Sequence, residues 1–154
     1  MRGTISHARE IIDVKTTAVK ALCGQDYSAE QVDRWTRIKD LREVENKVAR
    51  DPTFVAVANG AVVGYSQVAV QSGEILAVYV RPSHVRMGVG AAVLAAAEEC
   101  AVSSGRVSLW LDASLTAERF YAARGYKRQH SSSFALDSGV ELPCVRMTKT
   151  LPRR

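Results

Sequence analysis

The chain has 154 residues, of which 47% are hydrophobic and 24% are charged, and its formal net charge is +5. This length and balance suit one globular domain over residues 1–154 and exclude a disordered polymer. The longest apolar run, residues 89–97, is far shorter than the about 20 residues of a membrane span. The first ten residues also lack the apolar centre of a signal peptide. We therefore expect a soluble, cytoplasmic protein without a membrane partner.

The basic excess suits either nucleic acid or a polyphosphate ligand. Lysine and arginine are scattered, without a long basic run or interleaved aromatic residues, so a nucleic-acid partner is not expected. The three cysteines, Cys23, Cys100 and Cys144, are widely separated and form no CxxC or Cys/His spacing. We therefore expect no metal site.

The first third of the chain has the pattern of helices. Apolar residues at helical spacing predict a first helix over residues 5–22. Ser28 and Gln31 form the signature of a capping box, which predicts a second helix that runs through Trp35. A short third helix is expected over residues 41–48.

The pattern then changes to strands. Residues 54–57 and 61–65 flank Asn59 and Gly60, which is the strongest short signal for a β-hairpin. A second turn at residues 71–73 leads into a strand over residues 74–81. Three consecutive antiparallel strands are therefore predicted.

The last part of the chain alternates between helical and strand patterns, and its turn is expected at residues 137–139. The expected elements are a helix over residues 89–101, a strand over 107–111, a helix over 115–124, and strands over 126–136 and 144–151. This order predicts a mixed α/β fold with a central sheet covered by helices.

A glycine-rich loop joins the third strand to the helix that begins at Val89. Gly88 and Gly90 remove side chains where the backbone must approach another group closely. The first N–H groups of the helix are unpaired and, with the helix dipole, favour an anion. A cofactor that carries a diphosphate is therefore the first ligand to consider, although glycines also serve as plain tight turns.

Two linked segments resemble the GNAT superfamily of acetyl-coenzyme A-dependent N-acetyltransferases. The first is residues 74–90, with the family's loop pattern Gln/Arg-x-x-Gly-x-Gly/Ala; the second is residues 112–126, with its Ala, aromatic-Tyr and Gly-aromatic positions. Val85 stands where the loop usually has Gln or Arg, and Ser114 stands where many members have Asn. In the family this loop binds pyrophosphate mainly through backbone N–H groups, which any residue supplies.

The resemblance implies the GNAT-like α/β fold, with a mixed, mostly antiparallel sheet of about six to seven strands flanked by helices. Only residues 2–5 remain for the family's first strand. It also implies acetyl-CoA as cofactor, with Arg86 and Arg81 as candidates for the charge that the loop lacks at Val85. The cofactor-binding residues implied are Val78, Tyr79, Val80, Val85, Arg86, Met87, Gly88, Val89, Gly90, Ala91, Ser114, Ala117, Phe120 and Tyr121.

Acetyl transfer to an amine needs a base, an acid and a donor to the acetyl oxygen. Glu74 resembles the position that supplies the base in some members of the family, and Tyr121 matches the family's general acid. The backbone N–H near Val78 matches the donor. Glu74 as a solvated strand end and Tyr121 as a core aromatic residue are the alternatives. Ser114 is expected either to cap the following helix or to bond the cofactor.

The acceptor is expected to be a small primary amine. Tyr27 and Trp35 lie on the segment that forms one wall of the acceptor cleft in the family, and Tyr65 is a further candidate from the strands. The alternatives are a protein lysine or N-terminus as acceptor, a non-catalytic acyl-CoA-binding domain, and a nucleotide-binding protein. The last is disfavoured because the loop lacks the Lys-Ser/Thr ending of a phosphate-binding loop. The sequence leaves open whether the protein forms a homodimer.

Overall fold

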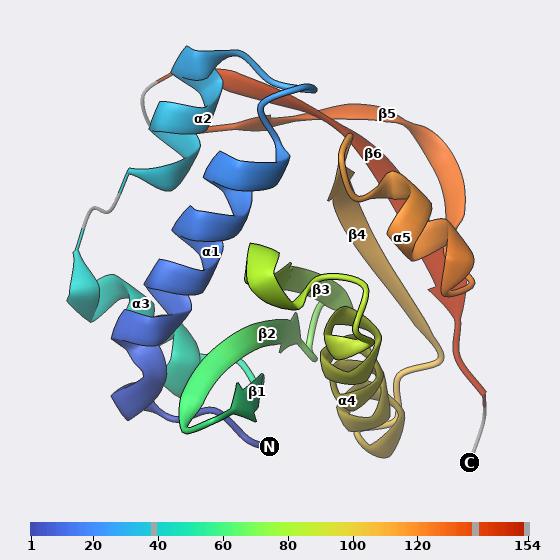
Figure 1. Ribbon diagram of the computed structural model, residues 1–154. Helices are drawn as coiled ribbons and strands as arrows, with labels where there is room; N and C mark the ends of the chain where they lie inside the picture. Colours follow the sequence, from blue (N-terminus) through green and yellow to red (C-terminus); the bar gives the residue numbers. More distant parts are fainter. Residues whose placement is uncertain (38–39, 137–138, 153–154) are drawn as a thin grey trace.

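The computed structural model describes residues 1–37, 40–136 and 139–152. Within these residues the chain forms one six-stranded sheet with helices on both faces (Figure 1), which confirms the expected architecture. The strand order is β1-β2-β3-β4-β6-β5. The strands are β1 Thr53–Ala58, β2 Ala61–Ala69, β3 Glu74–Val80, β4 Ser108–Ser114, β5 Lys127–Ala135 and β6 Glu141–Thr150.

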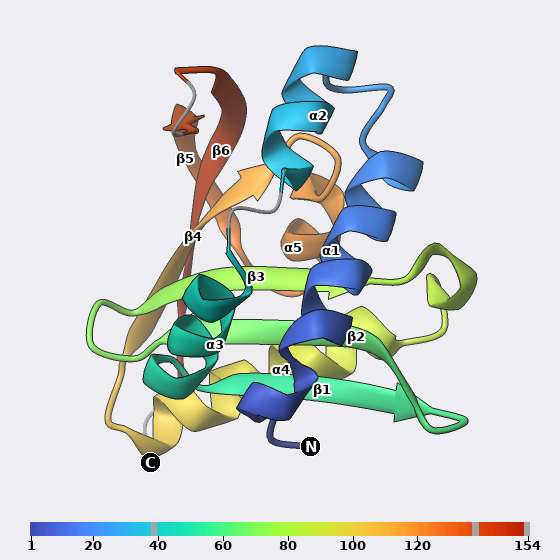
Figure 2. The same cartoon turned by 90° about the vertical axis from the view of Figure 1, so that its left-hand side faces the viewer.

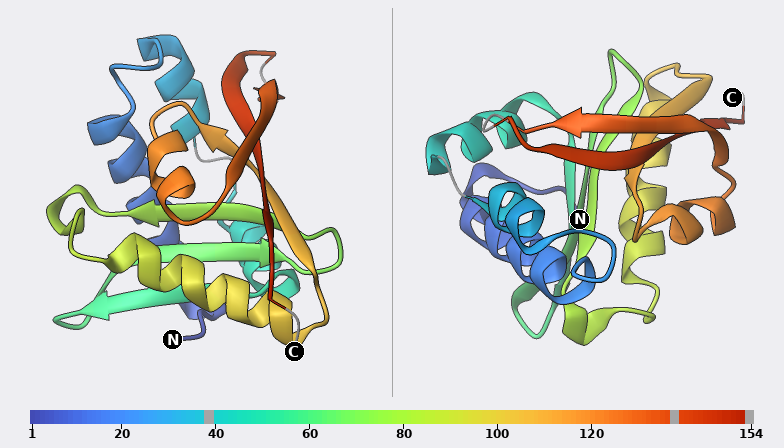
Figure 3. Two further views of the ribbon diagram at one scale, coloured as in Figure 1. Left: turned by 90° about the vertical axis from the view of Figure 1, so that its right-hand side faces the viewer. Right: turned by 90° about the horizontal axis from the view of Figure 1, so that it is seen from above.

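The helices divide between the two faces of the sheet, as the view from above shows (Figure 3). One face carries the short η1 Ile5–His7 and the helices α1 Ala8–Leu22, α2 Ala29–Thr36 and α3 Leu41–Arg50. The other carries α4 Val89–Ser103 and α5 Glu118–Ala123, with η2 Pro82–His84 in the loop before α4. None of these helices is both long and apolar enough to cross a bilayer, a finding that covers the described residues.

The predicted start of α2 is confirmed in detail. The amide of Gln31 donates to the Ser28 hydroxyl at 3.1 Å, and the Gln31 side chain accepts from the Ser28 amide at 2.8 Å. Two of the unpaired N–H groups at this helix end are thereby satisfied. The predicted hairpin also forms, with Asn59 and Gly60 both at positive φ between β1 and β2.

The core lies between the sheet and α4. Leu94 of α4 packs with Leu109 and Leu111 of β4 and with Met147 of β6, and all four side chains are fully buried. Each buried side chain of this size contributes about 1.5–3 kcal/mol to the free energy of unfolding. This core holds α4 against the sheet and so positions the loop at its N-terminus.

The six strands do not form a continuous surface. β3 and β4 run parallel and pair only at Glu74 and Trp110, so they diverge from that point onward. Figure 2 shows β1 to β3 and β4 to β6 leaning away from each other. The divergence leaves the edge of β3 that faces β4 unpaired around Val78, whereas the other edge stays paired with β2. The two cavities described below lie at this unpaired edge.

The structure differs from the sequence-based expectation at two places. Residues 2–5 form no strand, because Arg2 makes only an isolated bridge to Phe54 before η1 begins. β4 runs on to Ser114, so the last helix begins at Glu118 and not at 115. The turn expected at 137–139 has residues 137 and 138 outside the described part.

Candidate active site

Two cavities meet where β3 and β4 diverge. The loop-side cavity, of about 210 Å³, lies beside the start of α4 and includes Val80, Val85 and Gly90 in its wall. The acid-side cavity, of about 200 Å³, lies toward Glu74. Their common wall consists of Val78, Tyr79, Ser114, Ala117 and Tyr121. A group held in this wall can therefore reach ligands in both cavities.

The loop-side cavity ends at the N-terminus of α4. Gly88 caps that helix at a φ of 81°, a left-handed conformation that favours glycine, and Arg86 precedes it at a φ of 62°. The amides of Val89, Gly90 and Ala91 form the first turn of α4, where N–H groups have no partner within the helix. The loop therefore offers amides and a helix dipole to an anion.

Gly90 is required by the packing of this corner. A Cβ at Gly90 would lie 3.1 Å from the Phe120 ring of α5, which is tighter than an ordinary contact. Met87 is largely exposed, and Val89 is half-buried. The glycine thus lets α4 and α5 approach each other while the loop before it stays open to a ligand.

Two arginines flank the loop and differ in their contacts. Arg81 donates to the Val62 carbonyl at 2.8 Å and also pairs with Asp13 on α1. Arg86 is exposed and has no ion pair within the described residues. Arg86 is therefore the better placed of the two to meet a phosphate.

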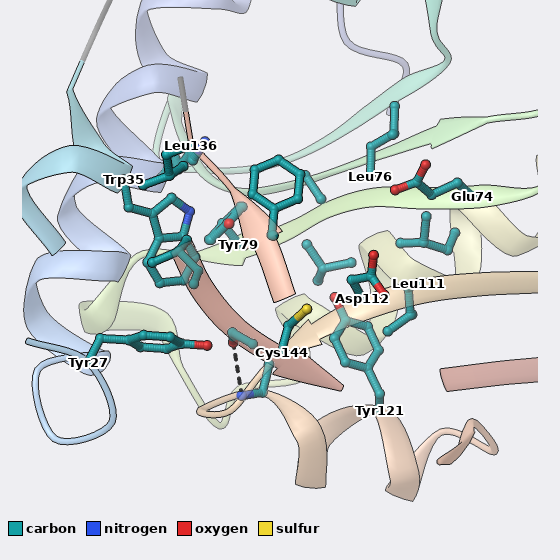
Figure 4. Close-up of a pocket in the computed structure, with 18 residues that line it drawn as sticks. Tyr27, Trp35, Glu74, Leu76, Tyr79, Leu111, Asp112, Tyr121, Leu136 and Cys144 are labelled. Atoms are coloured by element: carbon teal, nitrogen blue, oxygen red, sulfur yellow. Dashed lines mark hydrogen bonds between the residues drawn. The ribbon is translucent and has the colours of Figure 1, made fainter. Parts of the chain in front are cut away.

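Tyr121 occupies the shared wall, and its ring is held by two aromatic neighbours. It packs edge to face with Phe120 and Tyr126, at centroid distances of 5.2 and 5.6 Å. Its hydroxyl points into the acid-side cavity (Figure 4) and has no hydrogen-bond partner among the described residues. Burial raises the pKa of this phenol, with Tyr79 adding to the effect, so the group stays protonated. It can therefore donate a proton.

Glu74 stands at the point where the strands part, with two charged residues nearby. Burial raises the pKa of Glu74, and the like charge of Asp112 raises it further, whereas Arg146 lowers it. Arg146 itself is held by Asp112, with bonds of 2.6 and 3.3 Å from Nε and Nη2. A carboxylate with a raised pKa accepts a proton more readily than an exposed one.

Ser114 caps the turn after β4. Its hydroxyl accepts a hydrogen bond from the amide of Ala117 at 3.1 Å. The expected helix cap is therefore wrong in detail, because Ala117 is the N-cap of α5 and Ser114 closes the turn before it. Both residues also line the shared wall.

The aromatic residues predicted to bind the acceptor lie in different settings. Trp35 and Tyr27 line the acid-side cavity and contact each other at 5.3 Å between centroids. The Tyr27 hydroxyl is already used, because it donates to the Pro143 carbonyl at 2.6 Å and accepts from the Leu115 amide at 2.9 Å. Tyr65 is buried in another core cluster and lines neither cavity.

Sequence reasoning missed two charged residues of the acid-side cavity, Asp112 and Lys15. Asp112 lies inside the strand Leu-Trp-Leu-Asp-Ala-Ser, where an acidic residue is unusual, and this was an available signal. Lys15 sits on the amphipathic α1 among other charged residues and has no local signal of its own. Only the fold brings it to the cavity.

Comparison with known proteins agrees with this architecture. The family model described as an acetyltransferase (GNAT) domain matches residues 23–151. None of the curated proteins compared with the chain gives a significant match.

Solved structures share the fold over nearly the whole chain. A GCN5-related N-acetyltransferase from Rhodopseudomonas palustris is 27% identical, with a TM-score of 0.93 over 98% of this chain and 94% of that one. The PaiA N-acetyltransferase from Thermoplasma acidophilum, solved with coenzyme A, is 20% identical, with a TM-score of 0.80 over 97% and 96%. The putative acetyltransferase YncA from Salmonella typhimurium, solved with acetyl-CoA, is 18% identical, with a TM-score of 0.72 over 100% and 94%.

The match of the family model covers both halves of the diverging sheet, the glycine loop and the helix that carries Tyr121. The chain therefore belongs to the GNAT family of acetyltransferases, enzymes that use acetyl-CoA as the acyl donor.

Proposed function

We propose that the protein transfers the acetyl group of acetyl-CoA to the primary amine of a small molecule by direct attack, with Glu74 as base and Tyr121 as acid. The observation that carries the proposal is the position of the Tyr121 phenol. It lies in the wall common to both cavities, without a hydrogen-bond partner in the described part of the chain. A proton donor at that wall is within reach of an acetyl donor in one cavity and of an amine in the other.

The groups around the loop-side cavity support coenzyme A as the ligand on this side. The amides at Val89 to Ala91 and the open left-handed turn at Gly88 suit a diphosphate. The unpaired edge of β3 from Val78 to Val80 suits the amide groups of an extended arm, because β4 has moved away. When bound, acetyl-CoA supplies an activated acetyl group, and the Val78 amide is placed to donate to its oxygen.

Glu74 is proposed to remove the proton that an amine carries at neutral pH. A lysine-like amine has a pKa of about 10.4, so its neutral form is about 4–5 kcal/mol above the charged form at pH 7. A carboxylate whose pKa is raised by burial and by Asp112 accepts that proton more readily than an exposed one. Glu74 lines the acid-side cavity, where the proton acceptor must lie.

The cysteines support direct attack over an acyl-cysteine route. Cys23 lines the loop-side cavity and Cys144 the acid-side cavity. Burial raises the pKa of both thiols, and a protonated thiol is a poor nucleophile. Neither cysteine is therefore prepared to carry the acetyl group.

The size of the acid-side cavity supports a small acceptor. Its volume of about 200 Å³ lies below the about 300–1,000 Å³ of sites for drug-sized ligands. Leu142 of β6, Leu136 after β5 and Trp35 of α2 line it with apolar surface.

The test is release of free thiol from acetyl-CoA in the presence of a panel of small amines, with lysine peptides and peptides with free N-termini as the second arm. The proposal expects turnover with small amines and only slow release with the peptides. Faster turnover with peptides would contradict a small acceptor. Binding of acetyl-CoA without thiol release in either arm would contradict catalysis.

A further inference from the structure

The acid-side cavity adjoins a third cavity that no catalytic role explains. This third cavity, the cationic cavity, has a volume of about 290 Å³ and lies among α1, α2 and α3. The two cavities share Lys15, Trp35, Phe134 and Leu136 in their walls. An acceptor molecule longer than the acid-side cavity would therefore extend past these four residues.

Lys15 lies in the wall shared by the acid-side and cationic cavities, and no carboxylate in the described residues neutralises its charge. Its Nζ lies 5.9 Å from the centre of the Tyr79 ring, and no carboxylate pairs with it among the described residues. Burial lowers the pKa of Lys15, and the nearby Lys47 lowers it further. A cation in such a position is costly unless an anion joins it.

Further cations face the same cavity. Lys47 of α3 is exposed and Arg34 of α2 is half-buried, and neither forms an ion pair within the part of the chain that is described. Arg37 also lines the cavity, but it is held by Asp33 at 2.8 Å. Lys15, Lys47 and Arg34 thus remain available to one ligand.

Two acidic residues of the cationic cavity do not cancel these charges. The Asp40 carboxylate caps α3 by accepting from the Arg42 amide at 3.0 Å, and Glu43 is exposed on the first turn of that helix. Neither forms an ion pair with Lys15 or Lys47. The wall therefore has four cationic residues against two acidic ones, and the excess is positive.

The opposite end of the combined cleft has the reverse character. Glu74 at the start of β3 and Asp112 of β4 line the acid-side cavity. Lys15 lies beside Tyr79, five residues further along β3 than Glu74. Trp35, Phe134 and Leu136 supply apolar surface between the two ends. The cleft is thus acidic at one end, apolar in the middle and basic at the other.

We propose that the acceptor is a bipolar small molecule, with a primary amine that faces Glu74, an apolar spacer along Trp35, and an anionic group that binds Lys15 and Lys47. The anionic group is a carboxylate or a phosphate, because both groups accept charge-assisted hydrogen bonds from lysine. This inference rests on the proposed acetyltransferase function and specifies its substrate class. A polyamine, by contrast, would place a second cation against Lys15 and bind poorly.

The experiment compares matched amines in the thiol-release assay. Amino-alkyl and amino-aryl carboxylates of increasing length are measured against their methyl esters, and the corresponding phosphates against their neutral alcohols. We expect kcat/KM to be at least about tenfold higher for one anionic series than for its neutral partners. The series with the larger ratio of kcat/KM between anionic and neutral acceptors identifies the anionic group as carboxylate or phosphate.

The residue test uses two lysines on the same helix. Lys15→Met should raise KM at least about tenfold for the anionic acceptor and much less for the neutral partner. Lys20→Met, an exposed position on α1 that lines none of the cavities, should change neither. Lys47→Met, at an exposed site that folding does not require, should repeat the effect of Lys15→Met more weakly.

The outcomes separate this inference from the proposed function. Equal rates for anionic and neutral amines, or a Lys15→Met variant that loses both equally, would overturn the bipolar acceptor while leaving acetyl transfer intact. No thiol release with any amine would overturn both.

Discussion

The two cavities on either side of Tyr121 present different chemical groups to a ligand. The loop-side cavity is built from amides, glycines and apolar side chains, with Val78, Val80 and Gly90 in its wall. The acid-side cavity places charged side chains, Glu74, Asp112 and Lys15, around an apolar middle. The first is suited to a constant ligand bound by backbone, and the second to a ligand selected by side chains.

This difference has a physical origin in the diverging sheet. Parting of β3 from β4 exposes backbone donors and acceptors on the loop side, whatever side chains the strands carry. On the acid side, the same parting opens room that residues from α1, α2, β4 and β6 fill. Substitutions on the loop side should therefore change the affinity for coenzyme A, and substitutions on the acid side should change kcat/KM for the amine.

The largest effect is expected at the wall between the cavities. Tyr121→Phe removes only the phenolic proton and keeps the ring packed on Phe120 and Tyr126. We expect kcat to fall by about 10²–10⁴, with coenzyme A affinity within a few-fold of wild type. Steady-state kinetics and calorimetric titration measure the two quantities.

A neighbouring tyrosine provides the control for this substitution. Tyr126 is also buried but lines neither cavity, and its hydroxyl donates to Glu98 at 2.8 Å. Tyr126→Phe should lower stability by about 0.5–1.5 kcal/mol and leave kcat unchanged. An unchanged kcat in Tyr121→Phe would remove that phenol from the mechanism.

The next effect concerns Glu74, which is active as a base only when ionised. Because the pKa of Glu74 is raised, the rate should fall with decreasing pH through a value above the ordinary carboxylate pKa of about 4.3. Glu74→Gln should lower kcat/KM by about 10²-fold and abolish this acidic limb. Glu30→Gln, exposed on α2, should leave the pH–rate profile as in wild type. A limb that persists in Glu74→Gln would assign the base to another group.

A smaller effect is expected in the glycine loop, where two glycines allow a matched pair. Gly88 and Gly60 both have positive φ and open space around the position of a Cβ. Alanine at either site should lower stability by about 1–2 kcal/mol. Only Gly88→Ala should also weaken coenzyme A binding several-fold, as measured by calorimetry. Equal affinities in the two variants would mean that the loop does not hold the cofactor.

The smallest effect is a displacement of the pH–rate profile by Asp112→Asn. Removing this like charge lowers the pKa of Glu74, and the released Arg146 acts in the same direction. The acidic limb should therefore move to lower pH, by less than about one unit. A limb that moves to higher pH would contradict the electrostatic account of the acid-side cavity.

The same contrast explains how much could be predicted from the sequence. The hairpin at Asn59, the capping box at Ser28 and the loop at Gly88 depend on local residue types, and each is present as predicted. The position of Tyr121 in the shared wall also agrees with the motif that suggested it.

The residues of the acid-side cavity were harder to predict because they come from distant segments. Lys15 reaches the cavity from α1, and Asp112 reaches it from the extension of β4 that was missed. Tyr65 was predicted to bind the acceptor because of its residue type. It lies instead in a buried core cluster, where its ring stacks on Tyr79. Such placements depend on which faces the sheet and helices bury, and no local pattern reports that.

A crystal structure of the protein with acetyl-CoA tests the central claim most directly. The account predicts that the pyrophosphate contacts the amides from Met87 to Ala91 and that the thioester sulfur lies within hydrogen-bond distance of the Tyr121 hydroxyl. A pyrophosphate bound elsewhere, or a sulfur remote from Tyr121, would contradict it.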